Sequence, residues 1–360
     1  MGRSIWKTVG KTVLLILMAV LLLAGGLVVY LMATEYRPQA EETVNYTQEA
    51  TAKLAPGKSF TVLSFNIGYG GLGAESDFFM DGGRDVRPRR KETVQKNLKG
   101  IESILGDAEA DFYLLQEVDL DAKRSYGINQ AALLREGRAV DAAHALNYSC
   151  RYVPFPWPPI GRVHSGLYTM SHYVFNGEHT AVRQALPNPF SWPLRIANLK
   201  RCLLITRVAI EGTEQELVLV NLHLEAYDDG AGKTAQTAQL MNFLEAEYQK
   251  GNYVVAGGDF NCNFPVVDPN VWPILSLDTY VPGTIGNEAL PKGFQWAVDA
   301  VVPTCRLLNK PLDAPGDNQF YVIDGFILSP NVELMEAHTL DRSFQYSDHN
   351  PVLLRARLLP

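Results

Sequence analysis

Polar side chains follow several apolar runs that lie far apart in the sequence. The runs close with LSFN (63–66), LLQE (114–117), LVNLH (219–223) and VVAGGDFN (254–261), and SDHNPV (347–352) lies near the C-terminus. Carboxylate and amide oxygens are the ligands that Mg²⁺ prefers, and imidazoles can neutralise charge or move a proton at a phosphate. These residue types therefore favour chemistry in which a divalent cation holds a phosphoester.

The elements that must bring these groups together are strands, because short apolar runs rich in β-branched residues predict buried strands. Strands lying side by side would gather the polar groups at one edge of a sheet. The gathered residues would be Asn66, Glu117, His223, Asp259, Asn261, Asp348 and His349. Each residue alone is more typical of a turn or a surface, so the prediction depends on the ordered set.

The order of elements predicts an α+β fold. Helical spacing of apolar residues starts at Thr93, and two further helices are expected at 128–146 and 233–248. Strands are expected at 59–65, 112–116, 148–153, 166–170, 174–183, 202–209, 217–222, 253–256, 321–328 and 352–357. Several strands follow one another with no helix between them. This favours antiparallel or mixed sheets with helices outside over a doubly wound parallel sheet.

The N-terminal part contains an uncharged apolar stretch of 21 residues at 13–33, and about 20 residues suffice to cross a bilayer. Three basic residues precede it and Glu35 follows. The positive-inside tendency therefore predicts a cytoplasmic segment at 1–12 and a single-pass membrane protein whose large domain faces the extracytoplasmic side. The alternative is a cleaved signal peptide, whose apolar region is usually about 7 to 15 residues long. Since this stretch is longer, we expect an uncleaved transmembrane helix, followed by a polar linker at 34–58 that tethers the domain.

Length and composition predict one catalytic domain at 59–360, because strand signals with polar ends run through this whole region. The four cysteines show no CxxC spacing, which disfavours a zinc site built from thiolates. The net charge is −7, and the 29 basic and 39 acidic residues after residue 33 give −10. Such a surface has no global attraction for polyanions, which argues against a non-specific nuclease.

The ordered set of GDFN (258–261), SDHNPV (347–352), N-x-H (221–223) and QE (116–117) resembles the endonuclease/exonuclease/phosphatase superfamily. That superfamily includes deoxyribonuclease I, AP endonucleases, inositol polyphosphate 5-phosphatases and neutral sphingomyelinases. The resemblance covers 59–358. It implies a deoxyribonuclease I-like, four-layer α/β sandwich with two central mixed sheets, here preceded by one transmembrane helix. It also implies hydrolysis of a phosphoester with Mg²⁺, or with Mn²⁺ in its place.

The resemblance also implies which residues hold the cation. Glu117 resembles the main metal carboxylate. Asn66 would lie beside it, bound to the cation or to its water, and Asp348 resembles the second acidic residue near the cation.

The same resemblance assigns the catalytic residues. Asp259 would orient or deprotonate the attacking water, and Asn261 would donate to a phosphate oxygen. His349 would stand at the phosphate, oriented by Asp324 in the run YVIDGFI. His223 is a candidate acid for the leaving oxygen.

The substrate stays open at this point. A stiff aromatic segment at 152–161 and a basic run at 84–91 could contact a lipid head group, a base or a phosphate chain. The alternatives are packing at the edge of the sandwich and a solvated loop. A lipid head group or small phosphoester is favoured narrowly over nucleic acid. A nuclease of the same superfamily and a non-catalytic binding protein with this fold are the alternative functions. We expect a monomer whose partners are the phosphoester substrate and the membrane.

Overall fold

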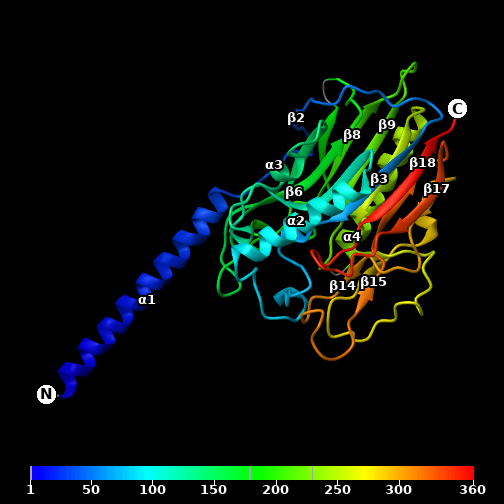
Figure 1. Cartoon of the computed structure of the whole chain (residues 1–360). Helices are drawn as coiled ribbons and strands as arrows, with labels where there is room; N and C mark the ends of the chain where they lie inside the picture. The colour runs from blue at the N-terminus through cyan, green and yellow to red at the C-terminus, as the bar shows by residue number, and fades with distance from the viewer. Residues whose placement is uncertain (1, 178–179, 229) are drawn as a thin grey trace.

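Two mixed sheets pack face to face, and helices cover their outer faces (Figure 1). The computed structural model describes residues 2–177, 180–228 and 230–360, and within them each sheet has seven strands. The helix α2 (Lys91–Ala108) packs on one sheet and α4 (Ala231–Gln249) on the other. The four-layer α+β sandwich expected from the sequence is confirmed, and it is preceded by the long apolar helix α1 (Gly2–Ala33).

Each sheet combines strands from distant parts of the chain. In spatial order, the first sheet consists of β1 (Glu41–Thr43), β7 (Ala181–Ala185), β8 (Cys202–Ala209), β9 (Glu216–His223), β10 (Tyr253–Asp259), β16 (Asp324–Leu328) and β13 (Gln295–Ala297). The second consists of β17 (Val332–Thr339), β18 (Val352–Leu358), β3 (Ser59–Asn66), β4 (Phe112–Asp119), β6 (Gly161–Ser171), β5 (Asp141–Val153) and β2 (Tyr46–Thr47).

Shorter elements lie in the connections. Two small strand pairs are β11 (Cys262–Asn263) with β12 (Gly283–Thr284), and β14 (Cys305–Arg306) with β15 (Phe320–Tyr321). The short helices are α3 (Gln130–Arg135), η1 (Gly68–Gly70), η2 (Phe79–Asp81), η3 (Lys123–Ser125), η4 (Leu194–Ile196) and η5 (Asn287–Ala289).

Alternation along the strands builds the layers. In β3, Phe60 and Val62 enter the core between the two sheets, whereas Leu63 and Phe65 pack under α2. Successive side chains of a strand point to opposite faces, so a strand covered on both faces is apolar throughout. This explains why the strand signals in the sequence are continuous apolar runs.

The strand directions bring all the polar-ended runs to one end of the sandwich. β3 and β4 are parallel neighbours in one sheet, and β9 and β10 are parallel neighbours in the other. β16 runs antiparallel to β10, and β18 runs antiparallel to β3, so they start where their neighbours finish. We call this end, where β3, β4, β9 and β10 finish, the carboxyl end of the sandwich.

A buried pair of amides joins the two sheets just inside the carboxyl end. Gln116 Nε2 in β4 donates to Asn221 Oδ1 in β9 at 2.8 Å, and Asn221 Nδ2 donates in turn to Leu115 O and Tyr168 O at 3.1 Å each. Both amide side chains are fully buried. A buried polar group that finds a hydrogen-bond partner avoids a large desolvation cost, and it specifies one register of packing.

The helix expected at 128–146 is largely wrong. The helix α3 ends at Arg135, and β5 starts at Asp141. The run is rich in alanine, which favours helix. However, Ala143 and Ala145 fill the narrow space between the sheets, so packing overrides the local preference. The strand β17 was not expected. The strand expected at 174–183 is largely wrong, because only its last three residues belong to β7; residues 178 and 179 of that prediction lie outside the described part of the chain.

The segment expected to be a linker at 34–58 contributes two short strands to the domain. β1 pairs with the edge strand β7, and β2 pairs with β5, so the segment adds a strand to each sheet. Leu54 is fully buried in the core between the sheets. Unpaired sheet edges are favourable places for an extended chain to add hydrogen bonds, which is the physical reason for the difference.

The domain end of α1 is also held in place. Leu27 and Leu31 pack with Tyr148, Val153 and Ile196 of the domain. The side chain of Glu35, two residues after the end of the helix, is 3% exposed, and its Oε1 lies 3.4 Å from Arg195 Nε and 3.5 Å from Lys200 Nζ. Trp6–Ala33 is long and apolar enough to cross a membrane, but a signal sequence passes the same test of length and composition.

Candidate active site

The predicted site residues meet at the carboxyl end, and three of them form its centre. Asn66 Nδ2 lies 3.1 Å from Asp259 Oδ2 and 3.4 Å from His349 Nε2. These residues are up to 283 positions apart in the chain, and all three are buried. The sequence predicts that these residues gather at the edge of one sheet. The structure instead forms the cluster from the facing edges of two sheets, because β3 and β18 belong to one sheet and β10 to the other.

Glu117 reaches the cluster because β4 is irregular at this point. The register of β4 against β6 shifts between Leu115 and Val118, and Glu117 has a positive φ of 56°. A β-bulge re-aims a side chain, and positive φ at a residue other than glycine is strained and often found at functional sites. The re-aimed carboxylate lies 3.4 Å from Asn66 Nδ2 through Oε1.

Asp348 is the second acidic group on this side. Its Oδ1 lies 3.3 Å from Ser347 Oγ, and Ser347 Oγ also donates to Asn66 O at 2.8 Å, so the SDH run is held against the end of β3. Burial raises the pKa of Asp348 to about 7, and the negative charge of Glu117 acts in the same direction, while His349 opposes them. Burial and the charge of Glu117 therefore outweigh the neighbouring positive charges of His349 and Arg306 at this carboxyl group.

His349 is paired with Asp324 at the start of β16. Its Nδ1 lies 2.8 Å from Asp324 Oδ2, which fixes the ring and leaves Nε2 facing the cluster. Burial alone would lower the pKa of His349, but the Asp324 carboxylate outweighs burial and raises that pKa well above its ordinary value. The imidazole is therefore held as a cation at neutral pH.

His223, at the end of β9, behaves in the opposite way. Its Nε2 lies 3.3 Å from Asp259 Oδ2. Burial lowers the pKa of His223 well below its ordinary value, and the charges of Arg201 and His349 act in the same direction. Two imidazoles near the same oxygen of Asp259, at 3.3 Å for His223 and 3.7 Å for His349, thus have pKa values shifted in opposite directions.

Asp259 occupies the middle of this arrangement. Burial raises its pKa to about 6, Asp324 adds to the rise, and His349 opposes it. The preceding Gly258 allows the strand to sit there, because a Cβ at this position would lie 1.9 Å from Leu222 O of β9. The carboxylate is therefore ionised at neutral pH, with a pKa close to what a general base needs.

Asn261 lies beside the cluster with its side chain partly engaged. Its Nδ2 donates to Leu224 O at 3.0 Å, its Oδ1 accepts from Tyr280 OH at 2.7 Å, and its backbone N–H donates to Asp259 Oδ1 at 2.9 Å. An amide nitrogen carries two hydrogens, so one remains for another acceptor.

One group of titratable side chains could hold a metal ion. Across residues 2–177, 180–228 and 230–360, Asp259, Asp324 and His349 are the His, Cys, Asp and Glu residues whose ligand atoms all lie within 4.8 Å of one another. This possible metal site differs from the predicted set of Glu117, Asn66 and Asp348. Asp324 Oδ1 is buried without a hydrogen-bond partner, which suits a cation, but a His349 that is protonated and paired with Asp324 is a poor ligand.

Arg124 is a neighbour that the sequence analysis missed. Its guanidinium lies 3.0 Å from Asp119 and 3.9 Å from Glu117, and it stacks on the Tyr69 ring with 3.8 Å from Cζ to the ring centroid. No motif marks it, because Arg124 belongs to the turn after β4 and its position depends on how η3 folds back. The only hint in the sequence is its place seven residues after Glu117.

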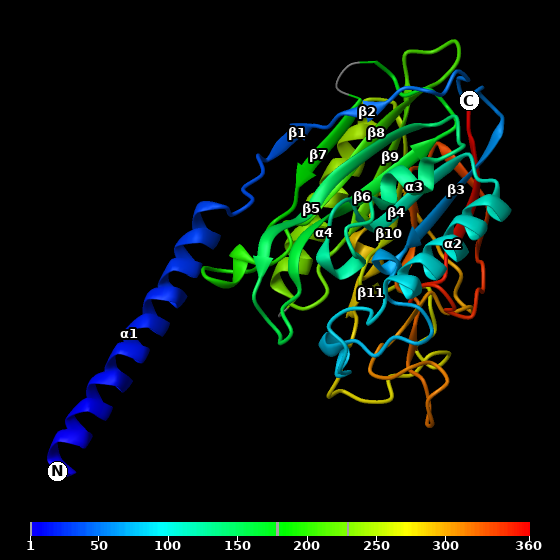
Figure 2. The same cartoon turned by 60° about the vertical axis from the view of Figure 1, so that its left-hand side comes forward.

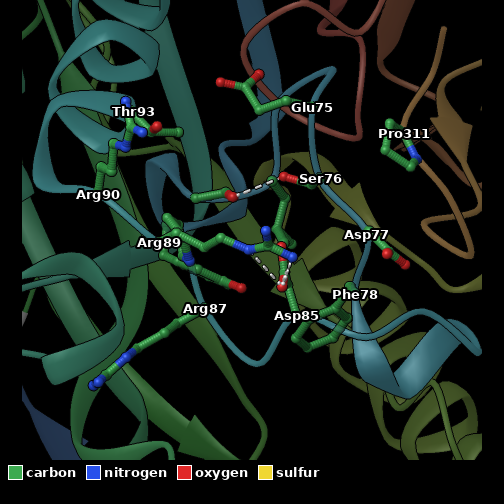
Figure 3. Close-up of a pocket in the computed structure, with 14 residues that line it drawn as sticks. Glu75, Ser76, Asp77, Phe78, Asp85, Arg87, Arg89, Arg90, Thr93 and Pro311 are labelled. Carbon is green, nitrogen blue, oxygen red and sulfur yellow. Dashed lines mark hydrogen bonds and ion pairs between the residues drawn. The ribbon is translucent and has the colours of Figure 1, made fainter. Parts of the chain in front are cut away.

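A separate pocket of about 410 Å³, with Tyr69 among its lining residues, is formed largely by the segment between β3 and α2. Figure 3 shows the labelled residues around it. It contains none of the predicted site residues. Its charged lining residues are Glu75, Asp77, Asp85, Arg87, Arg89 and Arg90. Arg89 is paired with Asp85 at 2.8 Å (Figure 3), and the opposite charges balance. The buried cluster, with its perturbed pKa values and convergent polar groups, is the better candidate for chemistry.

Comparisons with known proteins agree with this geometry. Residues 63–349 match the Endonuclease/Exonuclease/phosphatase family. The endonuclease/exonuclease/phosphatase of Beutenbergia cavernae is 18% identical with a TM-score of 0.57, over 84% of this chain and 72% of that chain. Truncated TDP2 of Caenorhabditis elegans is 16% identical with a TM-score of 0.51, over 84% of this chain and 99% of that chain.

The endonuclease/exonuclease/phosphatase of Bacteroides vulgatus has the same values as that TDP2, namely 16% identity, a TM-score of 0.51, and coverage of 84% and 99%. At these identities the likeness shows the fold alone. No curated protein matches the chain. The family match covers most of the sandwich, and the buried cluster lies within it, so this chain belongs to the endonuclease/exonuclease/phosphatase family and has its phosphoesterase fold.

Proposed function

We propose that this chain is a membrane-anchored phosphoester hydrolase that depends on Mg²⁺, or on Mn²⁺ in its place. The observation that carries the proposal is the contact of Asn66, Asp259 and His349 at the facing edges of two sheets. A structural role does not require a neutral imidazole, a cationic imidazole and a carboxylate to be buried together. In-line attack of water on a phosphoester needs such a combination of proton acceptor and positive charge.

Glu117, Asn66 and Asp348 would hold the cation. The support is electrostatic, because the pKa of Asp348 is raised to about 7 by burial, and a nearby Glu117 adds to the rise. Two carboxylates that repel each other would be stabilised by a divalent cation between them, and carboxylate oxygens are the ligands that Mg²⁺ prefers. A bound cation would polarise the phosphoryl oxygen and offset the charge that develops there.

The remaining residues act on water, phosphate and leaving group. Asp259 would accept a proton from the attacking water, and the Asn261 amide hydrogen that is not donated to Leu224 O would donate to a phosphate oxygen. His349, held as a cation by Asp324, would face the phosphate through Nε2. His223 is neutral in the free protein, and a bound phosphate anion would favour its protonation and its use as the acid for the leaving oxygen.

The full chain in detergent is expected to hydrolyse bis(p-nitrophenyl) phosphate with Mg²⁺ or Mn²⁺ and to lose turnover when the cation is chelated. Restoring the cation should restore turnover, and Glu117→Gln should raise the cation concentration needed by at least about tenfold. Release of p-nitrophenol measures both effects. Absence of turnover with every divalent cation would favour the non-catalytic binding protein.

Replacing Asp324 by Asn is expected to move the whole pH profile of kcat/KM towards acid. His349 loses the carboxylate that raises its pKa, so the alkaline limb shifts to lower pH. Asp324 also raises the pKa of Asp259, so the acidic limb shifts in the same direction. A pH series of initial rates measures both limbs, and an unshifted profile with only a lower rate would reduce Asp324 to a structural residue.

The apolar helix supports a location at the membrane. We propose a short cytoplasmic segment at 1–12, a transmembrane helix at 13–33 and a catalytic domain at 59–360 on the extracytoplasmic side. The packing of Leu27 and Leu31 against the domain supports retention of the helix, since a cleaved signal peptide has no use for such contacts.

The net charge of −10 after residue 33 supports a lipid head group or small phosphoester over nucleic acid as the substrate. We propose that the protein acts as a monomer.

A further inference from the structure

Exposed large apolar side chains gather in the connections at the carboxyl end. Phe155 and Trp157, between β5 and β6, are 73% and 87% exposed, and Trp192 and Leu194, between β7 and β8, are 57% and 64% exposed. Among the described residues outside α1, the exposed large apolar side chains away from this end are Met335 and Leu359. Single exposed apolar residues are ordinary, but several on one rim, two of them indoles, indicate an interaction surface.

The helix α1 leaves the domain at the same end. Leu27 and Leu31 pack with Val153 and Ile160, which flank the first of these connections, and with Ile196, which lies in the second. Figure 2 shows α1 extending from the side of the domain where β5 and β7 end. The exposed aromatic connections and the candidate membrane helix therefore belong to one continuous surface.

The length of α1 sets how deep this surface would lie. The proposed span at 13–33 has 21 residues, about 32 Å at 1.5 Å per residue, which matches a hydrocarbon core about 30 Å thick. Leu27 lies six positions before Ala33, about 9 Å along the axis. The domain residues that pack with this part of α1 are therefore between the head-group boundary and about 9 Å below it. Trp and Phe are the residues typical of that depth.

We infer that the carboxyl end of the sandwich docks on the bilayer that α1 spans, with Phe155, Trp157, Trp192 and Leu194 inserted into its interface. This inference rests on the proposed function, because it requires α1 to be retained in the membrane. It narrows the substrate to phosphoesters carried by lipid head groups, since the cluster of Asn66, Asp259 and His349 lies at the end of the sandwich that faces the lipid.

A cationic hollow beside the first connection fits the same partner. Its volume is about 410 Å³, and Arg87, Lys123 and Arg162 line it together with Tyr126. Arg162 is paired with Asp121 at 2.6 Å, and Tyr126 OH donates to Pro88 O at 2.8 Å, which joins the two loops that form the hollow. Positive side chains next to an apolar rim suit the phosphates of a bilayer surface.

The test uses the full chain in phosphatidylcholine nanodiscs whose acyl chains are brominated near the head group, or not brominated. Trp157→Phe removes one indole and keeps the site apolar, so the fluorescence lost on substitution reports Trp157 alone. Trp296→Phe is the matched control, because Trp296 is buried in the core under α4. We expect bromination to quench the Trp157 contribution at least about twofold more than the Trp296 contribution, as for an indole at the membrane interface.

Equal quenching of the two contributions would overturn the docking. Turnover of bis(p-nitrophenyl) phosphate by the same nanodiscs reports separately on the proposed function. Turnover without preferential quenching of Trp157 would support the proposed hydrolase activity and contradict docking on the bilayer. Quenching without turnover would keep the docking and reject the hydrolase.

Discussion

Replacing Asp259 by Asn is expected to lower kcat by about 10² to 10⁴-fold, the usual contribution of a general base. The reason is local. Asp259 Oδ2 lies 3.3 Å from His223 Nε2 and 3.1 Å from Asn66 Nδ2, so it is the carboxylate that these buried polar groups share. Asparagine keeps the shape and the hydrogen bond that Oδ1 accepts from the backbone of Asn261. Steady-state rates on bis(p-nitrophenyl) phosphate measure the effect.

The matched control is Asp107→Asn, an exposed carboxylate on α2, which should leave kcat within about twofold of wild type because it is far from charge development at phosphorus. The Asp259 variant should also retain its response to the cation in thermal unfolding. A rate within about tenfold of wild type would show that another group accepts the proton.

Replacing Asp348 by Asn is expected to stabilise the cation-free protein and to remove its stabilisation by Mg²⁺. Burial raises the pKa of Asp348 from an ordinary value of 3.8 to about 7. Between these values the folded state binds more protons than the unfolded state, so stability falls as pH rises through the window and is lowest above it. At about pH 8 the neutral amide avoids this penalty, and we expect a rise in Tm on the order of 5 °C.

Thermal unfolding at about pH 5 and about pH 8, with and without Mg²⁺, measures this pattern. Wild type should gain stability on acidification and on adding the cation, whereas Asp348→Asn should respond less to both. Asp278→Asn, an exposed carboxylate in the β11–β12 connection, should behave as wild type. If the Asp348 variant is still stabilised by Mg²⁺ as strongly as wild type, the cation lies elsewhere, and the group of Asp259, Asp324 and His349 becomes the better site.

The sequence predicts well the elements whose pattern is dictated by burial on both faces. The expected strand at 202–209 has the same bounds as β8, because both faces of this strand contribute to a core. The helix expected at 128–146 fails, because alanines can serve a helix or fill a narrow gap between sheets, and only the neighbouring strands decide between the two. The strand pairing of residues 41–47 cannot be predicted from their own sequence, since it depends on sheet edges that other segments provide.

The residues of the site are also predicted from the sequence only in part. The motifs at Asp259 and His349 identify the polar groups, and the strand order brings them together. Local sequence does not encode the bulge that turns Glu117 towards Asn66, or the approach of Arg124 to Glu117 from the next turn. The first depends on the register between β4 and β6, and the second depends on how η3 folds back after β4.

The amide pair of Gln116 and Asn221 has a consequence for any attempt to redesign this enzyme. Glu117, proposed to bind the cation, directly follows Gln116 in β4. His223, proposed to transfer a proton, lies two positions after Asn221 in β9. The hydrogen bond between the two amides therefore links the strands that hold these two residues. The distance between Glu117 and His223, between which a phosphoester would lie, is thus set by the packing of the two sheets. Exchanging the loops at the carboxyl end can change which substrate binds without changing that distance.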